Sequence, residues 1–249
     1  MTLCSCLPKK QNHSPRIKIV TSVPAIYDWT RNIINEKSNN TIYLSLIIKN
    51  GLNYHNYTPS PHEEDAIKTA DLFIYTGGDS EQWACKLATE KSICLSDDIH
   101  SLLSPKNAII YCQKICEAIC QLDTTNSDAY KKNCEDYITQ LKLLSDAYEL
   151  TAMQAKDSTF IFCDRFPFKN LFDDYGLNYI TAFDICPAPL EEAKKINSDT
   201  AKILGKKIDQ TNATAVYTME ILIKKLQKQQ LVILKILNAT RLHLIQWKA

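Results

Sequence analysis

The chain has 249 residues, of which 45% are hydrophobic and 23% are charged, and its formal net charge at pH 7 is +1. This length can bury the core of one large domain or of two smaller lobes. The near-zero net charge argues against nucleic acid or an anionic membrane surface as the main partner. The totals therefore indicate a globular protein and leave its activity open.

The first 15 residues read as an anchor and a tether. Leu3-Cys4-Ser5-Cys6 resembles a bacterial lipobox, in which the final residue, Cys6, becomes lipidated after cleavage. The polar segment that follows would be a tether. Because a lipobox needs an apolar region before it, we expect the true start of the protein to lie upstream of Met1. The alternative is a frayed terminus with accidental cysteines. No other segment approaches the roughly 20 apolar residues of a membrane span.

Short apolar runs alternate with helical patterns in the first half of the chain. The runs predicted to form strands are Ile17–Thr21, Thr41–Ile48, Leu72–Tyr75 and Ile93–Leu95. Helices are predicted at Ala25–Asn35 and after two Ser-Pro starts, Ser60-Pro61 and Ser104-Pro105, the second of which continues to about Gln121. At the first Ser-Pro start, Glu63 completes a capping box. This alternation is typical of a parallel sheet.

A long helical pattern from Ser127 to about Ala155 separates this region from a second alternating one. The later predicted elements are the strand Thr159–Phe162, the helix Phe168–Tyr175, the strand Asn178–Ala182, the helix Glu191–Gln210 and the strand Thr214–Thr218. The predicted fold is α/β, with two lobes, each a parallel sheet flanked by helices, joined by a long linking helix. The predicted boundaries are residues 1–15 for the anchor and tether, 16–122 for the N-terminal lobe, 123–156 for the linking helix, 157–220 for a partial C-terminal lobe and 221–249 for a non-homologous tail.

The ten cysteines include no C-x-x-C pair, which disfavours a zinc ribbon or a thioredoxin motif. Cys112, Cys116 and Cys120 recur at every fourth residue of a predicted helix. They read either as small hydrophobic residues on a buried face or as a thiol metal site, and we favour the first interpretation. A large disulfide framework is not expected in a chain of this size with such spacing.

Ligands of open parallel sheets bind beyond the carboxyl ends of the strands, so the residues at those positions are the candidates for chemistry. Two histidines, His55 and His100, each follow a predicted strand and precede a Ser-Pro helix start. In the second half, Cys163 and Asp164 follow one strand and Glu220 follows another. Two imidazoles with a carboxylate or a thiolate would suit zinc or another transition metal. The alternative is that each histidine only makes a backbone hydrogen bond. Asp97 and Asp98 read as residues that cap or solvate the loop, although either could accept the second ring N–H of His100.

Three stretches of the sequence carry a family resemblance. The segments "HNYTPSPHEEDAIKTADLFIYTGGDSEQW", "DDIHSLLSPKNAI" and "CDRFPFKNLFDDYGLNYITAF" closely resemble motifs of the cluster A-I metal-binding proteins, the zinc or manganese receptors of ABC importers. The third stretch is similar to a zinc-associated branch of that family. The resemblance runs from about Arg16 to Glu220 and implies two lobes bridged by a rigid helix, with the metal in the cleft between them.

The resemblance implies that His55 and His100 are the metal ligands of the N-terminal lobe. It leaves the ligands of the C-terminal lobe open among Cys163, Asp164, Cys186 and Glu220. It further implies Zn2+, with Mn2+ less favoured, as the transported ligand, an ABC permease and its ATPase as partners, no catalytic activity and no nucleic acid. The expected protein is a monomer outside the cytoplasm, held to the outer face of the bacterial cell membrane by a lipid anchor.

The resemblance stops at Glu220. Back-translation of "ILIKKLQKQQLVILKILNATRLHLIQWKA" with AT-rich codons gives, one base back, a family-like "NKKIA". We therefore expect a frameshift near Glu220 and Ile221, and a divergent amphipathic helix is the alternative. An inactive remnant of a receptor and, less favoured, a metal-dependent hydrolase that uses His55 and His100 are the alternative functions. No H-E-x-x-H motif supports the hydrolase.

Overall fold

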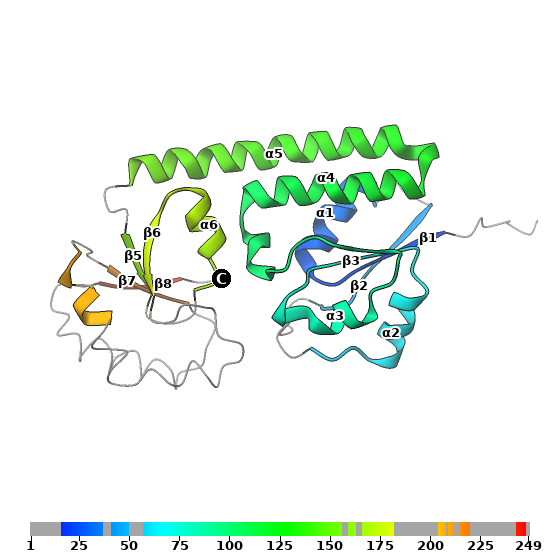
Figure 1. Cartoon of the computed structure of the whole chain (residues 1–249). Helices are drawn as coiled ribbons and strands as arrows, with labels where there is room; N and C mark the ends of the chain where they lie inside the picture. The colour runs from blue at the N-terminus through cyan, green and yellow to red at the C-terminus, as the bar shows by residue number, and fades with distance from the viewer. Residues whose placement is uncertain are drawn as a thin grey trace, which may run out of the picture.

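The computed structural model describes residues 16–36, 41–49, 57–155, 159–162, 166–181, 204–207, 209–211, 215–219 and 243–247. These residues form two α/β lobes, with one long helix running across both of them (Figure 1). The predicted fold class is confirmed. The predicted helix Glu191–Gln210 lies mostly outside the described residues, as does the lipobox with Cys6.

The N-terminal lobe is built on a parallel sheet with the strand order β2-β1-β3-β4. Its strands are β1 (Ile17–Thr21), β2 (Ile42–Leu46), β3 (Leu72–Tyr75) and β4 (Ser92–Cys94). In the two central strands, the last three residues of β1 and all four residues of β3 are buried, and most of them are apolar. Such runs are typical of a parallel sheet that is covered on both faces.

Helices cover both faces of this sheet. The structure has α1 (Pro24–Ile34) and α4 (Pro105–Leu122) on one face, and α2 (Pro61–Lys68) and α3 (Gln82–Leu87) on the other (Figure 1). Both Ser-Pro starts are confirmed as helix N-termini, because Ser60 and Ser104 are the N-caps of α2 and α4. At α2 the predicted capping box is present: the Ser60 hydroxyl accepts from Glu63 N, and the Glu63 carboxylate accepts from Ser60 N at 2.7 Å. The short helix α3 was not predicted.

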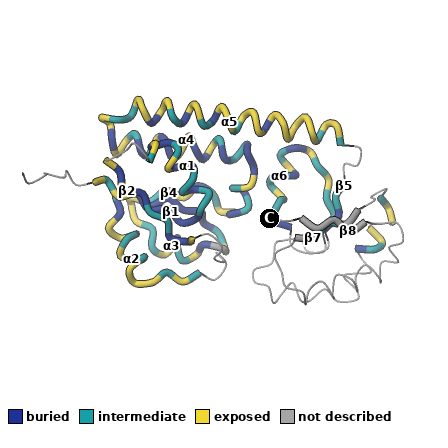
Figure 2. The backbone as a smooth tube through the Cα atoms, turned by 180° about the vertical axis from the view of Figure 1, so that it is seen from behind, coloured by how far each residue is buried: buried dark blue, intermediate teal, exposed yellow. Residues whose placement is uncertain are grey.

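The long helix α5 (Ser127–Gln154) follows a 3-10 turn, η3 (Thr124–Asn126). Its 28 residues correspond to a rod of about 42 Å. Its N-terminal half packs on α1 and α4, where Asn133 Nδ2 donates to Ile33 O and Tyr137 OH donates to Asp28 Oδ2. Its outer face is exposed along its length (Figure 2). Among the described residues no helix is both long and apolar enough to cross a bilayer.

The C-terminal lobe has a parallel sheet with the strand order β6-β5-β7-β8. Its elements are β5 (Thr159–Phe162), α6 (Lys169–Asp174), β6 (Asn178–Thr181), β7 (Ala215–Met219) and β8 (His243–Trp247). A small core of Phe162, Phe166 and Phe172 packs beside β5. Strand β8 lies within the segment expected to be non-homologous and pairs with the whole of β7. The frameshift and the incompleteness of this lobe stay predictions.

Candidate metal centre

Of the candidate ligands, only His100 lies within the described residues. His55, Cys163, Asp164, Cys186 and Glu220 lie outside them, as does the lipidation candidate Cys6. The described part of the centre therefore consists of His100 and of the residues that flank the other candidates.

His100 is held in a short 3-10 helix between β4 and α4. This helix, η2 (Ile99–Leu103), begins after Asp98, whose carboxylate caps it by accepting from His100 N at 2.9 Å. It ends at Ser104, which is also the N-cap of α4. Ile99 and Ser101 are buried within it. The backbone of His100 is thus fixed on both sides. The edge strand β4 and the Asp98 cap precede it, and the capped helix α4 follows it.

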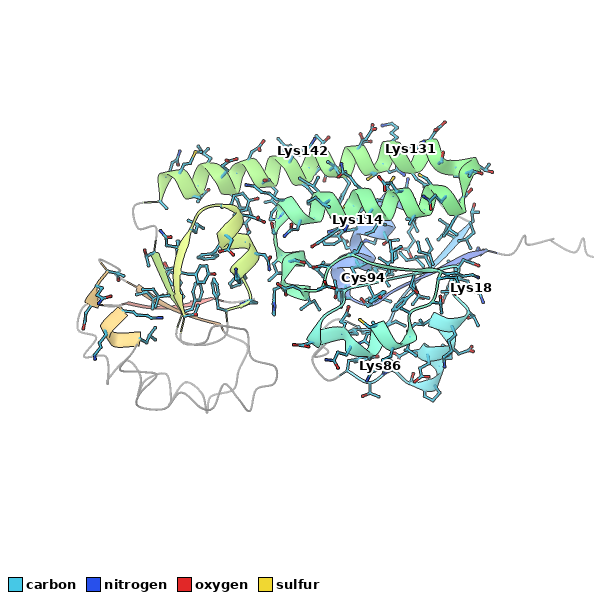
Figure 3. The ribbon with its side chains drawn as sticks, viewed as in Figure 1. Lys18, Lys86, Cys94, Lys114, Lys131 and Lys142 are labelled. Atoms are coloured by element: carbon cyan, nitrogen blue, oxygen red, sulfur yellow. The ribbon has the colours of Figure 1, made fainter. Side chains whose placement is uncertain are left out.

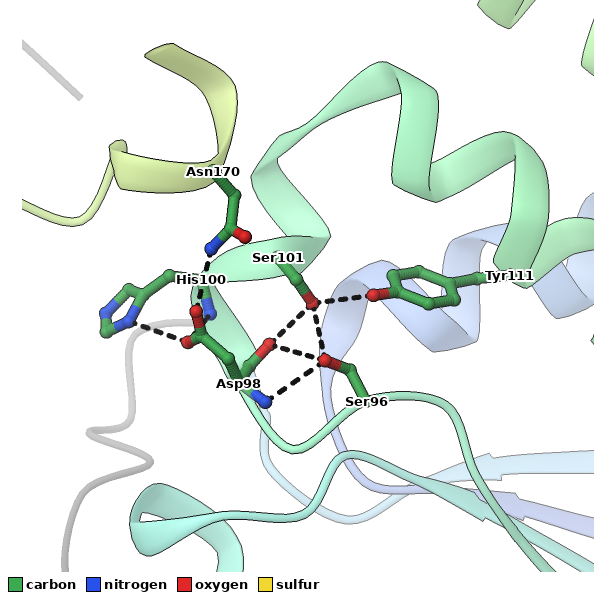
Figure 4. A network of polar contacts seen from close by, with 6 residues as sticks. All are labelled: Ser96, Asp98, His100, Ser101, Tyr111 and Asn170. Atoms are coloured by element: carbon green, nitrogen blue, oxygen red, sulfur yellow. Dashed lines mark hydrogen bonds and ion pairs between the residues drawn. The ribbon is translucent and has the colours of Figure 1, made fainter. Parts of the chain in front are cut away.

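The imidazole of His100 is oriented by the same carboxylate. His100 Nδ1 lies 3.1 Å from Asp98 Oδ1, and the His100 side chain is only 14% exposed (Figure 4). Since an ionised carboxylate only accepts hydrogen bonds, Nδ1 carries the proton and the lone pair of the neutral ring is on Nε2. Nε2 is buried. A carboxylate on one ring nitrogen and a lone pair on the other is the arrangement of a metal-ligating histidine.

Asp98 is held ionised by these contacts. The hydrogen bond from His100 lowers the pKa of the Asp98 carboxyl to about 2, against the opposing effect of partial burial. Asp98 Oδ2 accepts a further hydrogen bond from Asn170 Nδ2 at 2.7 Å. Asn170 belongs to α6, so the residue that orients the histidine of one lobe is itself held by the other lobe (Figure 4).

A network of hydroxyl groups fixes the turn beneath Asp98. Asp98 N donates to Ser96 Oγ at 3.1 Å, and Ser101 Oγ donates to Ser96 Oγ at 2.9 Å. Tyr111 OH, from α4, donates to Ser101 Oγ at 2.8 Å (Figure 4). The position of Asp98 is therefore tied to the core helix α4.

A second set of contacts joins α6 to the start of α4. Ser104 Oγ donates to Asp174 Oδ2, and Lys106 Nζ donates to Asp174 O at 2.7 Å. The Lys106 ammonium also lies 4.7 Å from the centre of the Tyr175 ring. The two lobes therefore touch directly next to His100.

Tyr57, the first described residue after His55, lies near the part of the sheet that leads to His100. Strands β2 and β4, which precede the two histidines in the sequence, lie at opposite edges of the sheet. Tyr57, two residues after His55, packs on Trp83 of α3 with ring centroids 5.5 Å apart. Tyr57 OH also donates to Glu63 Oε1 at 2.8 Å. Because α3 lies between β3 and β4 in the chain, this contact brings the segment after His55 to the side of the sheet where His100 lies.

The candidates of the C-terminal lobe follow two neighbouring strands. Cys163 comes directly after Phe162 of β5, and Glu220 comes directly after Met219 of β7. Phe162 pairs with Tyr217 in a parallel ladder, so the carboxyl ends of both strands lie at one edge of the sheet. Within the part of the chain that the structure describes, no three His, Cys, Asp or Glu side chains are gathered as a metal site.

Glu81 lies buried at the carboxyl edge of the N-terminal sheet, and it was not predicted. Its Oε2 atom accepts from Ser22 Oγ at 3.1 Å, from Thr76 N at 2.8 Å and from the Thr76 hydroxyl. Ser22 follows β1 and Thr76 follows β3, so this carboxylate ties the ends of the two central strands together. Burial raises the pKa of Glu81 to about 6, despite these three hydrogen bonds.

The prediction that Asp97 or Asp98 orients His100 is confirmed for Asp98. The contributions of Asn170, Ser101 and Glu81 were missed. Asn170 is distant in the sequence, and nothing local indicates its contact with Asp98. Glu81 belongs to the quoted "YTGGDSEQW" stretch, where an acidic residue after two glycines was a signal available from the sequence.

Each lobe has a parallel β-sheet flanked by helices, one long helix bridges the two lobes, and a carboxylate orients a histidine where the lobes meet. Together these features define the class of cluster A-I metal-binding proteins. The comparisons with known proteins agree. The model of the family "Zinc-uptake complex component A periplasmic" matches residues 19–232. The chain belongs to this family.

Curated relatives are similar over most of this chain. It is 26% identical over 204 residues to the high-affinity zinc uptake system protein ZnuA of Bacillus subtilis, covering 69% of this chain and 62% of the relative. It is 25% identical over 238 residues to the zinc-binding lipoprotein AdcA of Streptococcus pneumoniae, covering 83% and 46%. The chain thus spans about half to three fifths of the length of these relatives. Neither name is that of an enzyme, in agreement with the prediction that the chain is not one.

Solved structures share the fold. The metal-dependent lipoprotein YcdH of Bacillus subtilis superposes with a TM-score of 0.72 at 22% identity, covering 93% of this chain and 88% of that one. Zn(II)-bound AdcA of Streptococcus pneumoniae gives a TM-score of 0.70 at 22% identity, covering 93% and 51%.

Proposed function

We propose that this protein is an extracytoplasmic receptor that captures Zn2+ between its lobes and delivers it to the permease and ATPase of an ABC importer. It acts as a monomer, and a lipid on Cys6 attaches it to the outer face of the bacterial cell membrane. Membership in a zinc-uptake family supports this function.

The observation that carries the proposal is the His100–Asp98 pair. Asp98 fixes the tautomer and the direction of the ring, and Asp98 is itself held by Asn170 on α6 of the second lobe. An imidazole that is already oriented loses little side-chain entropy on binding a metal. A surface histidine that only makes a backbone contact would not need such support.

The proposed ligand set is His55 and His100 from the first lobe, with partners from Cys163, Asp164 and Glu220 of the second. Imidazole nitrogen suits zinc, and a thiolate would favour zinc over manganese because zinc is the softer ion. A set of protein side chains that closes the coordination sphere suits a carrier better than a catalyst, which keeps a position open for water.

Metal content tests the proposal. The full chain is loaded with Zn2+, separated from free metal and analysed for bound zinc beside the His55→Ala, His100→Ala and His62→Ala variants. His62 is exposed in the first turn of α2 and serves as the matched control. We expect one zinc per chain in the wild type and in His62→Ala, and its loss in the other two variants.

Other outcomes would support the other functions. No metal in the wild type under any loading condition would indicate the remnant and contradict the receptor. Zinc-dependent turnover of an ester or a phosphate would indicate the hydrolase. Tighter retention of Mn2+ than of Zn2+ in a direct competition would overturn the choice of metal.

A further inference from the structure

Four cysteine thiols gather between α4 and α5, away from the candidate metal centre. Cys112, Cys116 and Cys120 lie on one face of α4, and Cys134 comes from the first half of α5. Cys112, Cys116 and Cys134 are buried, which confirms the interpretation as core residues for Cys112 and Cys116, while Cys120 is half-buried. The facing thiol on α5 was not predicted, because it lies on a different helix.

The sulfur atoms are close to one another. Cys116 Sγ lies 3.9 Å from Cys120 Sγ, and Cys134 Sγ donates to Cys112 O at 3.5 Å. The second contact places Cys134 against the helical turn that leads to Cys116. A hydrogen bond between the two thiols raises the pKa of Cys116 and lowers the pKa of Cys134. Cys134 therefore has the larger thiolate fraction of the two, and the thiolate is the reactive form.

Solvent can reach this cluster through a pocket. A pocket of about 380 Å³ is lined by Cys116, Cys120 and Cys134 together with charged side chains, among them Lys131, Glu117 and Glu135. Its size and polar rim suit a small hydrophilic molecule. A metal is not the expected occupant, since no three of the described His, Cys, Asp or Glu side chains are arranged to hold one.

We propose that Cys116 and Cys134 are a redox-active pair that closes an interhelical disulfide by exchange with a small hydrophilic disulfide, of which oxidised glutathione is the test compound. The Cys134 thiolate attacks one sulfur of that disulfide and releases the other as a thiolate. Cys116 gives its proton to the released thiolate and attacks the Cys134 sulfur of the mixed disulfide, which expels the second small thiolate. Two protein thiols become one disulfide, and one small disulfide becomes two thiols.

Geometry favours a disulfide between Cys116 and Cys134 over one between Cys116 and Cys120, which both lie on α4. Side chains four residues apart on one helix have Cβ atoms about 5–6 Å apart. A disulfide needs about 3.5–4.5 Å between them, so Cys116 and Cys120 cannot be joined without distorting the helix. Cys116 and Cys134 lie on facing helices, where a small shift between the helices can adjust the separation.

The bond would lock the bridging helix onto the N-terminal lobe. It would close a loop of 18 residues (134 minus 116), for which the melting temperature is expected to rise by roughly 5–10 °C. The proposal concerns the α4–α5 contact and does not depend on zinc capture.

Peptide mapping of the full chain tests the proposal. The protein is reduced, freed of reductant, incubated with oxidised or reduced glutathione under native conditions, alkylated and digested with trypsin. Cleavage after lysine separates the peptide 115–131, with Cys116 and Cys120, from the peptide 133–142, with Cys134. Figure 3 shows the cleavage sites Lys114 on α4 and Lys131 and Lys142 on α5.

We expect the two peptides to be linked after oxidation in the wild type and in Cys120→Ser, and to be separate in Cys116→Ser. The oxidised wild type should also melt at the higher temperature. Glutathione adducts without linked peptides in the wild type would overturn the proposal. A link that survives in Cys116→Ser but is lost in Cys120→Ser would do the same. The wild type and Cys120→Ser decide the matter even if Cys116→Ser fails to fold.

Discussion

Asp98 orients His100, the proposed metal ligand of the N-terminal lobe. It accepts from both the backbone N–H and the ring Nδ1 of His100, and Asn170 holds its other oxygen. These three contacts fix which ring nitrogen carries the lone pair. The proposed role of His100 as a ligand therefore depends on the pair and not on the histidine alone.

Replacing Asp98 tests this dependence. In Asp98→Asn the charge that orients the imidazole is lost, and we expect zinc affinity to fall by roughly 10–100-fold. Competition with a zinc-binding dye measures the change. Asp97→Asn is the matched control, because Asp97 is the exposed neighbour and carries the same charge. Equal affinity in Asp98→Asn and the wild type would show that Asp98 does not prepare His100.

Glu81 gives the stability of the N-terminal lobe an unusual pH dependence. Its pKa is raised from 4.5 to about 6 in the folded chain, so folding favours its protonated form. The stabilisation that follows is fully present below about pH 4.5 and is lost as the pH rises through about 6. The shift corresponds to about 2 kcal/mol in the free energy of unfolding.

Urea unfolding of the wild type and of Glu81→Gln from pH 4.5 to 7.5 measures the contribution of Glu81 to the free energy of unfolding. The glutamine does not titrate, so the other carboxylates cancel in the difference between the two proteins. We expect the stability of the wild type relative to the variant to fall as the pH rises, mostly between pH 4.5 and 6.5. A difference that does not change with pH would contradict the raised pKa.

Some residues that act through short sequence spacings were predicted from the sequence, whereas Asn170, which acts across the lobes, was not. The helix start at Ser60 and the histidine after β4 rest on spacings of a few residues, which a single sequence shows. The contact of Asn170 with Asp98 joins positions 72 residues apart, and only the folded chain brings them together. Strand β8 was not predicted for the same reason, because its pairing with β7 joins segments that are far apart in the sequence.

At the scale of elements, two neighbouring turns set the position of η2. The turn after β3 contains Gly77 and Gly78, and Gly77 N donates to Ser96 O at 2.6 Å in the turn after β4. Gly78 has a φ of +74°, and a Cβ there would lie 1.9 Å from Asp97 O. The turn that carries Asp97 and Asp98 can take its place only because residue 78 has no side chain.

Gly78→Ala is therefore expected to displace the Asp98 turn. The backbone strain alone costs about 1–3 kcal/mol of stability, and the clash with Asp97 should also weaken zinc binding. Gly176→Ala is a matched control: its φ is +66°, but a Cβ there meets nothing within 4 Å. It should lose stability and keep its zinc affinity, as thermal melting and zinc titration of both variants will show. If both variants bind zinc equally well, the close approach of the two turns is not needed for the site.

At the scale of the whole molecule, α5 resists a hinge between the lobes. Its first half is bound to α1 through Asn133 and Tyr137, and farther along Tyr175 OH donates to Ser145 Oγ at 2.9 Å. The contacts of α6 with the start of α4 add a second link. One continuous helix and a direct contact between the lobes leave little room for a large closing motion.

Small-angle scattering of the metal-free and zinc-loaded chain tests this rigidity. We expect the same radius of gyration in both states, because zinc capture needs only local movement near His100. A marked compaction on loading would mean that the lobes close as rigid bodies. The scattering of His100→Ala with added zinc provides the baseline for metal that does not bind at the site.

We propose that zinc binds to Nε2 of an imidazole that Asp98 has already oriented. A crystal of the zinc-loaded chain, measured on both sides of the zinc absorption edge, locates the metal directly. We expect an anomalous peak about 2.0–2.1 Å from His100 Nε2, with Asp98 still on Nδ1. Zinc bound without His100, or bound to its Nδ1 after Asp98 has been displaced, would contradict it.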